Sequence, residues 1–189
     1  MKARKLLEVI EVCERLKDTT RHCYTRNGRH ESVAEHSWMM TLMAFFMRDE
    51  FKDVDMDKVI RMCIIHDLGE VFTGDIPTFL KTNVNEETEE NLLTSWVNTL
   101  PENYHDEMLS LYEEMSLRET KEAKVYKAID SLEALIQHNE SDISTWIPLE
   151  YELNKTYAFD KVEFSEYLTA LRKEILKDTL DKIASEKHD

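Results

Sequence analysis

The chain has 189 residues, of which three are glycine and three are proline. This length suits one domain with a substantial core, and so few turn-forming residues favour helices joined by polar loops over tight hairpins. The formal net charge of −15 argues against a general binder of nucleic acid polymers or anionic membranes, because both need clustered Lys and Arg. We therefore expect one all-α domain that acts on a small molecule or a protein.

Charge is unevenly distributed along the chain. Residues 83–120 carry ten acidic side chains against Arg118 as their one basic residue, whereas residues 1–30 carry eight Lys or Arg against four acids. Positive potential attracts anions. A small phosphorylated substrate is therefore expected near the N-terminal third.

Cysteine usage and the N-terminal sequence favour a cytoplasmic protein. Cys13, Cys23 and Cys63 are odd in number, follow no zinc or redox spacing, and are expected to be reduced packing residues. Charged residues within positions 2–8 interrupt any signal-peptide run, and no stretch of 18 apolar residues is present to span a membrane.

The first two helices are predicted from apolar spacing. An apolar stripe at helical spacing predicts the first helix and comprises Leu6, Val9, Ile10, Cys13 and Leu16. A polar loop is expected from Asp18 to Glu31. Ser32 and Glu35 have the form of a capping box. The helix that they open has one inner face, made of Val33, His36, Met40, Met43 and Met47.

Further helices follow with recognisable boundaries. Asp55 or Asp57 can cap a third helix that ends a little past Gly69, and Pro77 makes the stretch 74–78 a loop. Acidic helices are expected over about 86–99 and 102–115. A second capping box at Ser116–Glu119 predicts a long helix to about 139, and a last helix is expected at about 161–184. The three tryptophans, Trp38, Trp96 and Trp146, are interpreted as packing residues.

The pair His66-Asp67 is the most unusual local feature, because it follows the apolar run 62–65 directly. Burying an ionised carboxylate costs several kcal/mol or more unless a charge or a metal compensates it. Taken alone, such a pair is more often a helix-end ion pair than a metal site.

Other residues strengthen the metal interpretation. His36 lies on the inner face of its helix, near the positive N-terminal end, which favours the neutral imidazole that a metal needs. Asp130 stands in mid-helix, where Asp is unfavourable without a tertiary reason. Glu70, one turn beyond His66, and Asp75 in the following loop suit proton transfer beside a metal. Each of these residues taken singly is as well explained by packing or solvation.

The pattern His36, His66-Asp67 and Asp130 in a helical chain resembles the H…HD…D signature of HD-domain phosphohydrolases. Three segments are similar to the 5′-deoxynucleotidase branch of that family: residues 21–37, 66–78 and 127–135. The resemblance covers roughly residues 5–155, and we expect a single HD-type helical bundle over 1–189, with a C-terminal helix at about 161–184 beyond the HD core.

The resemblance implies roles for particular residues. The metal ligands would be His36, His66, Asp67 and Asp130. Glu70 and Asp75 would be the catalytic carboxylates. The substrate would contact Arg21 through its phosphate, and also His22, Asp75, Ile76, Pro77 and Thr78. The bacterial members tend to carry Trp after that arginine, and this chain departs from them with His22, which can still stack on or hydrogen-bond a sugar.

The implied activity is hydrolysis of a deoxynucleoside 5′-monophosphate by a cytoplasmic enzyme. Imidazole and carboxylate ligands suit Mn²⁺, Co²⁺, Fe²⁺ or Zn²⁺ better than Mg²⁺. Four ligands imply one ion, and His22, His30, His105 and His138 lack the spacing for a second. A homodimer is expected by analogy with relatives.

Two alternatives stay open from the sequence. One is another HD activity, such as a nucleotide phosphodiesterase, a triphosphohydrolase or an alarmone hydrolase. The other is a non-catalytic helical interaction module that binds a basic partner through the acidic region 83–120.

Overall fold

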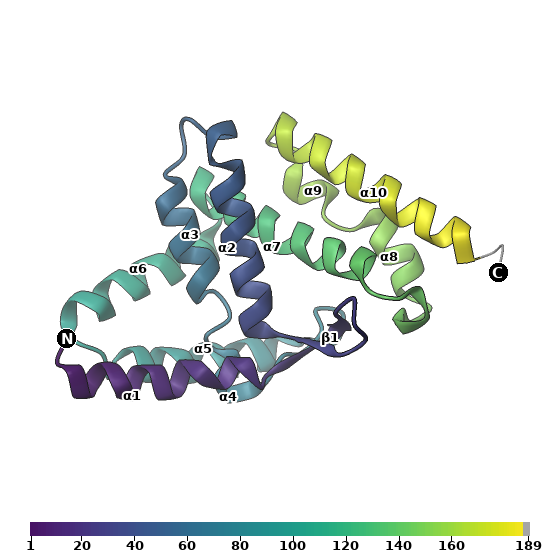
Figure 1. Cartoon of the computed structure of the whole chain (residues 1–189). Helices are drawn as coiled ribbons and strands as arrows, with labels where there is room; N and C mark the ends of the chain where they lie inside the picture. The colour runs from purple at the N-terminus through teal and green to yellow at the C-terminus, as the bar shows by residue number, and fades with distance from the viewer. Residues whose placement is uncertain (187–189) are drawn as a thin grey trace.

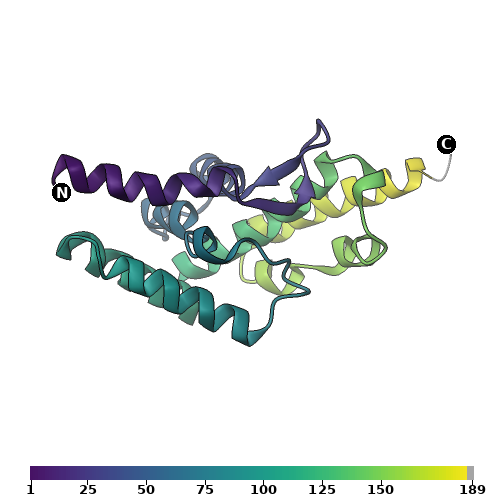
Figure 2. The same cartoon turned by 90° about the horizontal axis from the view of Figure 1, so that it is seen from below.

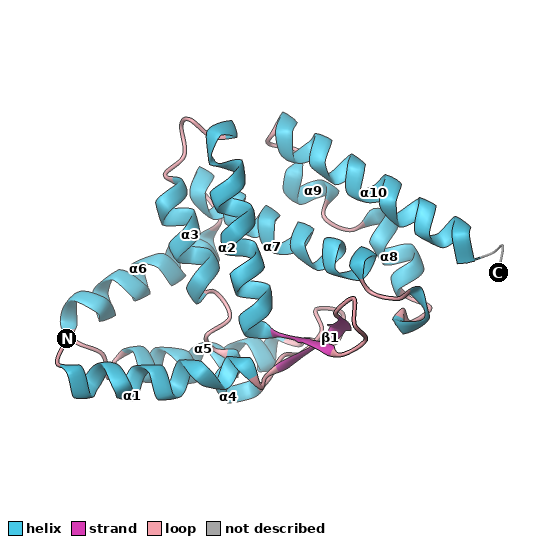
Figure 3. Ribbon diagram, in the orientation of Figure 1, coloured by secondary structure: helices cyan, strands magenta, loops and turns pink. Residues whose placement is uncertain are grey.

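The computed structural model describes residues 1–186 as a helical molecule with one small β-hairpin (Figures 1 and 3). Helix α1 (Ala3–Cys13) and helix α10 (Glu166–Glu186) lie at opposite ends of the molecule in both views (Figures 1 and 2). The predicted all-α class is confirmed. Within the described residues, no helix is long and apolar enough to cross a membrane.

The hairpin is a feature that composition argued against. Strands β1 (Thr20–Tyr24) and β2 (His30–Ser32) pair antiparallel where a loop was expected. Gly28 has a φ of 79°, which costs glycine no steric strain, and its N–H donates to the Thr25 carbonyl. One glycine at the position that needs it is enough, so a low overall glycine count did not exclude a hairpin.

Helix α2 (Val33–Met47) begins at the predicted residue. The Ser32 hydroxyl accepts from the Glu35 N–H, and the Glu35 carboxylate accepts from the Ser32 N–H, so the capping box is present. A short 3-10 turn, η1 (Glu14–Lys17), links α1 to the hairpin, and a second, η2 (Arg48–Glu50), follows α2. Helix α2 packs against α3 (Met56–Ile65) and α7 (Lys121–Glu140).

Helix α3 is capped by Asp55, whose side chain accepts from the Lys58 N–H. It ends at Ile65, earlier than expected, and His66 is its C-cap. A tight turn over 66–69 then leads into α4 (Glu70–Thr73). The chain therefore changes direction at His66-Asp67, and Asp67 belongs to neither helix.

Helices α5 (Asn83–Val97) and α6 (Glu102–Leu117) occupy the acidic region, as predicted. The proposed capping box at Ser116 is wrong. Helix α6 runs through Ser116 to Leu117 and ends at Arg118 in the left-handed conformation, and Thr120 caps α7. The sequence around Ser116 satisfied the pattern, but the hydroxyl of Thr120 is the one that accepts from Ala123 N–H.

The C-terminal part begins with the 3-10 turn η3 (Ile143–Thr145). Two short helices, α8 (Glu150–Thr156) and α9 (Phe159–Val162), were not predicted, and α10 starts later than expected. Both short helices contact α10, and α9 also contacts α7. The predicted end of the last helix, at about 184, falls inside α10.

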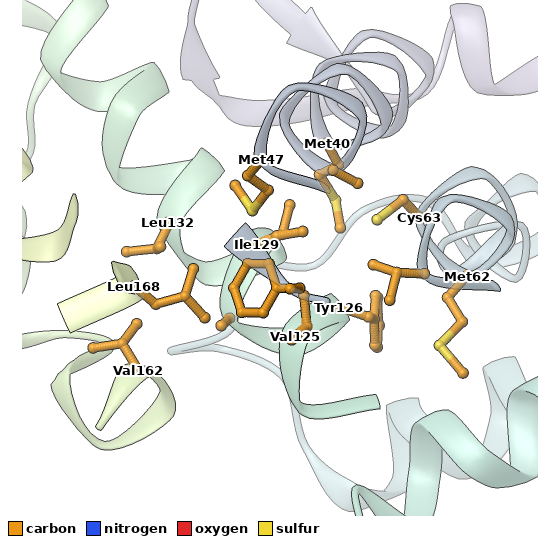
Figure 4. Packing of buried hydrophobic residues seen from close by; sticks show 14 of the residues in the cluster. Met40, Met47, Met62, Cys63, Val125, Tyr126, Ile129, Leu132, Val162 and Leu168 are labelled. Carbon is orange, nitrogen blue, oxygen red and sulfur yellow. The ribbon is translucent and has the colours of Figure 1, made fainter. Parts of the chain in front are cut away.

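The main hydrophobic core lies between α2, α3, α7 and α10 (Figure 4). Met40, Met62 and Ile129 are fully buried in it. A second cluster joins Leu16 and Val33 to Leu93 and Val97 of α5. Together these clusters fix α2, the α3–α4 turn and α7 against one another.

Two packing expectations need correction. Trp38 is 58% exposed, although Trp146 is buried as expected and Trp96 packs partly against the second cluster. The predicted stripe of the first helix is covered only in part, because Leu6 and Ile10 are 49% and 53% exposed while Leu16 is buried. The three cysteines are free thiols, and Cys23 and Cys63 are buried.

Candidate metal and active site

The structure brings together the four residues that the sequence suggested as metal ligands. His36 comes from the first turn of α2, His66 and Asp67 from the end of α3, and Asp130 from the middle of α7. The His36 Nε2 atom lies 3.3 Å from Asp130 Oδ1 and 3.9 Å from Asp67 Oδ2, and His66 Nε2 lies 2.8 Å from the same Asp67 oxygen. Ligand atoms of His36, His66 and Asp67 all lie within 4.8 Å of one another, and Asp130 adjoins this space through His36.

The tautomer of His66 indicates that this space suits a cation. His66 Nδ1 lies 2.9 Å from the Cys63 carbonyl oxygen, which can only accept, so Nδ1 carries the proton. The Nε2 atom faces the Asp67 carboxylate, and it is a buried atom without a hydrogen-bond partner of acceptable geometry among the described residues. A cation bound between this nitrogen and the carboxylate would satisfy both atoms.

His36 is oriented by Glu133, which the sequence analysis did not select. His36 Nδ1 donates to the Glu133 carboxylate, leaving Nε2 directed at Asp130 and Asp67. Burial and Arg21 oppose a charged ring, but Glu133 and Asp130 outweigh them and raise the pKa of His36 to about 10. The helix N-terminus was expected to keep this ring neutral, and the buried carboxylates are the stronger influence.

The two aspartates are held ionised. Burial favours their neutral forms, but His66 and His36 lower the pKa of Asp67 to about 2. Lys127, which pairs with the second oxygen of Asp130, holds the pKa of Asp130 well below its usual range despite burial. Lys127 thus orients Asp130 from the side opposite His36. Both carboxylates are available as anionic ligands.

Arg21 of β1 is anchored by two buried acids. Its Nη1 atom donates to Glu31 at 2.9 Å and to Glu133 at 3.2 Å, and only 10% of the side chain is exposed. Glu31 also accepts from the thiol of Cys23 at 3.2 Å. Glu133 therefore links Arg21 to His36. A signal in the sequence was available, since Glu133 follows Asp130 by one helical turn.

Glu70 and Asp75 lie close enough to Asp67 for its charge to act on both carboxyl groups. Glu70 is buried, and its Oε2 atom has no hydrogen-bond partner among residues 1–186. Burial, followed by the charges of Asp67 and Asp75, raises the pKa of Glu70 to about 10. Burial also raises the pKa of Asp75, although Arg21 opposes this. Glu70 is thus set up to carry a proton.

The expected substrate loop, residues 75–78, lies near strand β1. Gly74 ends α4 with a φ of 76°, which suits glycine, and turns the chain toward Asp75. Ile76 and Pro77 are half-buried and Thr78 is exposed. The ring of Phe79 packs edge-on against His22, with 5.5 Å between centroids. This contact brings the loop to the hairpin beside Arg21.

Comparisons with known proteins show the family of the chain. A family model described as HD domain matches residues 13–172. The human 5′-deoxynucleotidase HDDC2 is 31% identical over 144 residues, which are 73% of this chain and 69% of the relative. The Dictyostelium discoideum protein of the same name is 30% identical over 71% of this chain and 76% of its own length. A crystal structure described as a predicted metal-dependent phosphohydrolase from Magnetospirillum magnetotacticum MS-1 superposes with a TM-score of 0.81 at 27% identity, covering 95% of each chain. The chain belongs to the HD-domain family of metal-dependent phosphohydrolases.

Proposed function

We propose that this protein is a 5′-deoxynucleotidase, which hydrolyses deoxynucleoside 5′-monophosphates to deoxynucleosides and phosphate. The observation that carries the proposal is the convergence of His36, His66, Asp67 and Asp130, whose imidazole nitrogens and carboxylate oxygens face one another at 2.8–3.9 Å. The relatives that bear this activity in their names, at about 30% identity, supply the substrate class.

The residues present fit a divalent ion of the transition series. Two imidazole nitrogens and two carboxylates suit Mn²⁺, Co²⁺, Fe²⁺ or Zn²⁺ better than Mg²⁺. Such an ion supplies Lewis acidity toward a phosphate oxygen and activates water. In this proposal the four residues hold it, and Glu133 fixes the ring of His36 through Nδ1.

The remaining residues handle the phosphate and the protons. Arg21 keeps its charge, because Glu133 and Glu31 raise its pKa although burial opposes this, so it can neutralise a phosphate oxygen. Glu70 holds a proton on its carboxyl group and would donate it to the leaving 5′-oxygen. Asp75 would accept a proton from the attacking water. His22 and the loop 75–78 would contact the nucleoside.

The test is phosphate release by the metal-loaded protein. Protein loaded with Mn²⁺ or Co²⁺ should hydrolyse deoxynucleoside 5′-monophosphates, and Asp67→Ala should abolish hydrolysis and reduce bound metal. Equal phosphate release by the variant would remove the proposal.

A substrate panel separates the other HD activities. Deoxynucleoside monophosphates, ribonucleoside monophosphates, nucleoside triphosphates, cyclic dinucleotides and alarmones would be compared at equal concentration. Preference for any class other than the first would replace the nucleotidase assignment. Absence of hydrolysis across the panel, with metal bound, would favour the non-catalytic interaction module.

We further propose that the chain forms a homodimer and acts in the cytoplasm. A groove of about 610 Å³ between α1, α2, α3, α5 and α6 is lined almost wholly by apolar atoms. Ile10, Trp38 and Ile64 on its walls are each more than half exposed. Apolar patches of this kind usually mark an interface, and a second copy is the partner that is always present at the same concentration.

A further inference from the structure

A second group of potential metal ligands lies on the neighbouring part of the fold. His22 of β1, His138 near the end of α7 and Glu150 at the start of α8 offer nitrogen and oxygen atoms that all lie within 4.8 Å of one another. None of the three belongs to the four-residue cluster of His36, His66, Asp67 and Asp130. The spacing along the chain gave no hint of this group, because the residues come from three separate elements.

The distances fit a shared ion. Glu150 Oε1 lies 3.2 Å from His22 Nε2 and 3.7 Å from His138 Nε2. Two ligand atoms that each lie about 2.0–2.1 Å from a tetrahedral Zn²⁺ are about 3.3 Å apart. The group therefore requires little rearrangement to bind one.

The hydrogen bonds leave the facing atoms free. The second Glu150 oxygen, Oε2, accepts from the Ile147 N–H at 2.8 Å, which fixes the carboxylate and directs Oε1 at both rings. His22 Nε2 is buried and has no hydrogen-bond partner of acceptable geometry within residues 1–186, despite its closeness to Oε1. His22 Nε2, His138 Nε2 and Glu150 Oε1 therefore lie close together without a hydrogen bond of acceptable geometry between them.

Burial and protonation also suit a ligand set. The side chains of His138 and Glu150 are 9% and 3% exposed, and that of His22 is 30% exposed, so an ion can enter past His22. Burial lowers the pKa of His138 to about 4, although Glu150 opposes this. Burial favours a neutral Glu150, but His22 and His138 lower the pKa of its carboxyl group. A neutral imidazole and a carboxylate are the forms that bind metals.

We propose that His22, His138 and Glu150 form a second site for a transition-metal ion such as Zn²⁺ or Co²⁺. Three protein ligands leave at least one coordination position open. The ion would tie the hairpin to α7 and α8, and would sit beside the loop whose Phe79 packs on His22. This site does not depend on the proposed nucleotidase activity.

Cobalt retention tests the proposal. The full chain would be stripped with a chelator, equilibrated with Co²⁺, passed through gel filtration and analysed for cobalt by mass spectrometry and visible absorption. We expect two ions per wild-type chain and one in Asp67→Ala, and none in Asp67→Ala combined with His138→Gln. Co²⁺ should raise the thermal unfolding midpoint of Asp67→Ala but not that of the double variant.

Matched variants make the outcome specific. Glu150→Gln and the half-exposed His22→Gln should each have the effect of His138→Gln, and circular dichroism would verify folding. His105→Gln changes a histidine that pairs with Asp106 and Asn98 instead, and should retain two ions. Retention of no cobalt by Asp67→Ala, or cobalt unaffected by all three substitutions in this group, would overturn the proposal. Absence of phosphate release by the wild-type protein, with two ions retained, would count against the nucleotidase alone.

Discussion

At the scale of single residues, Glu133 is the side chain on which the site depends most without being a proposed ligand. It is 1% exposed and accepts from both His36 and Arg21. A carboxylate behind a histidine fixes the tautomer and increases the basicity of the ligand nitrogen. Glu133 therefore positions both His36, the proposed metal ligand, and Arg21, the proposed phosphate-binding residue.

Glu133→Gln tests this role. The amide keeps the shape but loses the charge, and we expect the dissociation constant for Mn²⁺ or Co²⁺ to rise about 10- to 100-fold. Isothermal titration of the chelator-stripped protein measures it. Glu140→Gln, an exposed acid on the same helix, is the control and should bind as the wild type does. Unchanged affinity in Glu133→Gln would show that His36 is oriented by other contacts.

Glu70→Gln separates proton transfer from metal binding. The variant cannot donate a carboxyl proton, so kcat should fall about 10²- to 10⁴-fold, while bound metal stays at the wild-type level. Steady-state kinetics with metal analysis provide both readouts. The exposed Glu90→Gln should leave kcat unchanged. A parallel loss of metal and kcat in Glu70→Gln would instead make Glu70 part of the metal environment.

At the scale of elements, one carboxylate of α6 links that helix to α3 and to the N-cap of α7. Glu114 of α6 pairs with Lys58 of α3 and accepts from the hydroxyl of Thr120, the N-cap of α7, at 2.5 Å. Burial opposes ionisation, but these two partners lower the pKa of Glu114. The ionised carboxylate of Glu114 therefore stabilises the contact of α3 and α6 with the start of α7, the helix that carries Asp130 and Glu133.

The pH dependence of stability follows from the direction of this shift. A carboxyl group with a lowered folded pKa contributes stability above its unfolded pKa of about 4.3 and loses it as the pH falls through the folded value. Glu114→Gln should reduce the free energy of unfolding by about 0.5–1 kcal/mol at pH 7. Urea unfolding at pH 7 and at pH 3 would show the difference shrinking in acid. The exposed neighbour Glu113→Gln should have no comparable effect, and a pH-independent difference would exclude an ionic origin.

At the scale of the whole molecule, the apolar groove at the α1 end bears on assembly. Ile10→Glu places a charge in this groove, and burying it against a second copy would be costly. We expect the wild type to have twice the 22.4 kDa chain mass by light scattering, and Ile10→Glu to be monomeric. Leu180→Glu on α10, which is also exposed but lies at the other end of the molecule, should stay dimeric (Figure 1). A wild-type monomer at all concentrations would contradict the proposal.

Much of the fold was predictable because its signals are local. Apolar spacing predicted α1 and α2. The capping box at Ser32 predicted the start of α2, since a helix end is decided by hydrogen bonds within a few residues. The motif of His36, His66-Asp67 and Asp130 could be selected for the same reason. Each is chemically unusual for its own position.

The misses have a common physical origin. The hairpin depends on pairing across a turn. The capping box at Ser116 did not form because α6 continues through Ser116 and ends only at Arg118. Trp38 was interpreted as buried, but whether an apolar face finds a partner within the same chain is decided by the arrangement of helices.

The sequence by itself determined the helical class, the family resemblance and the four candidate metal ligands. Only the tertiary structure decided that Glu133 joins His36 to Arg21, and that His22, His138 and Glu150 meet. Local propensity acts between residues about one helical turn apart. These groups instead come from elements far apart in the sequence, with more than a hundred residues between Arg21 and Glu133, and the packing of those elements brings them together. Hydrogen-bond and coordination partners at such separations leave no periodic trace in a single chain.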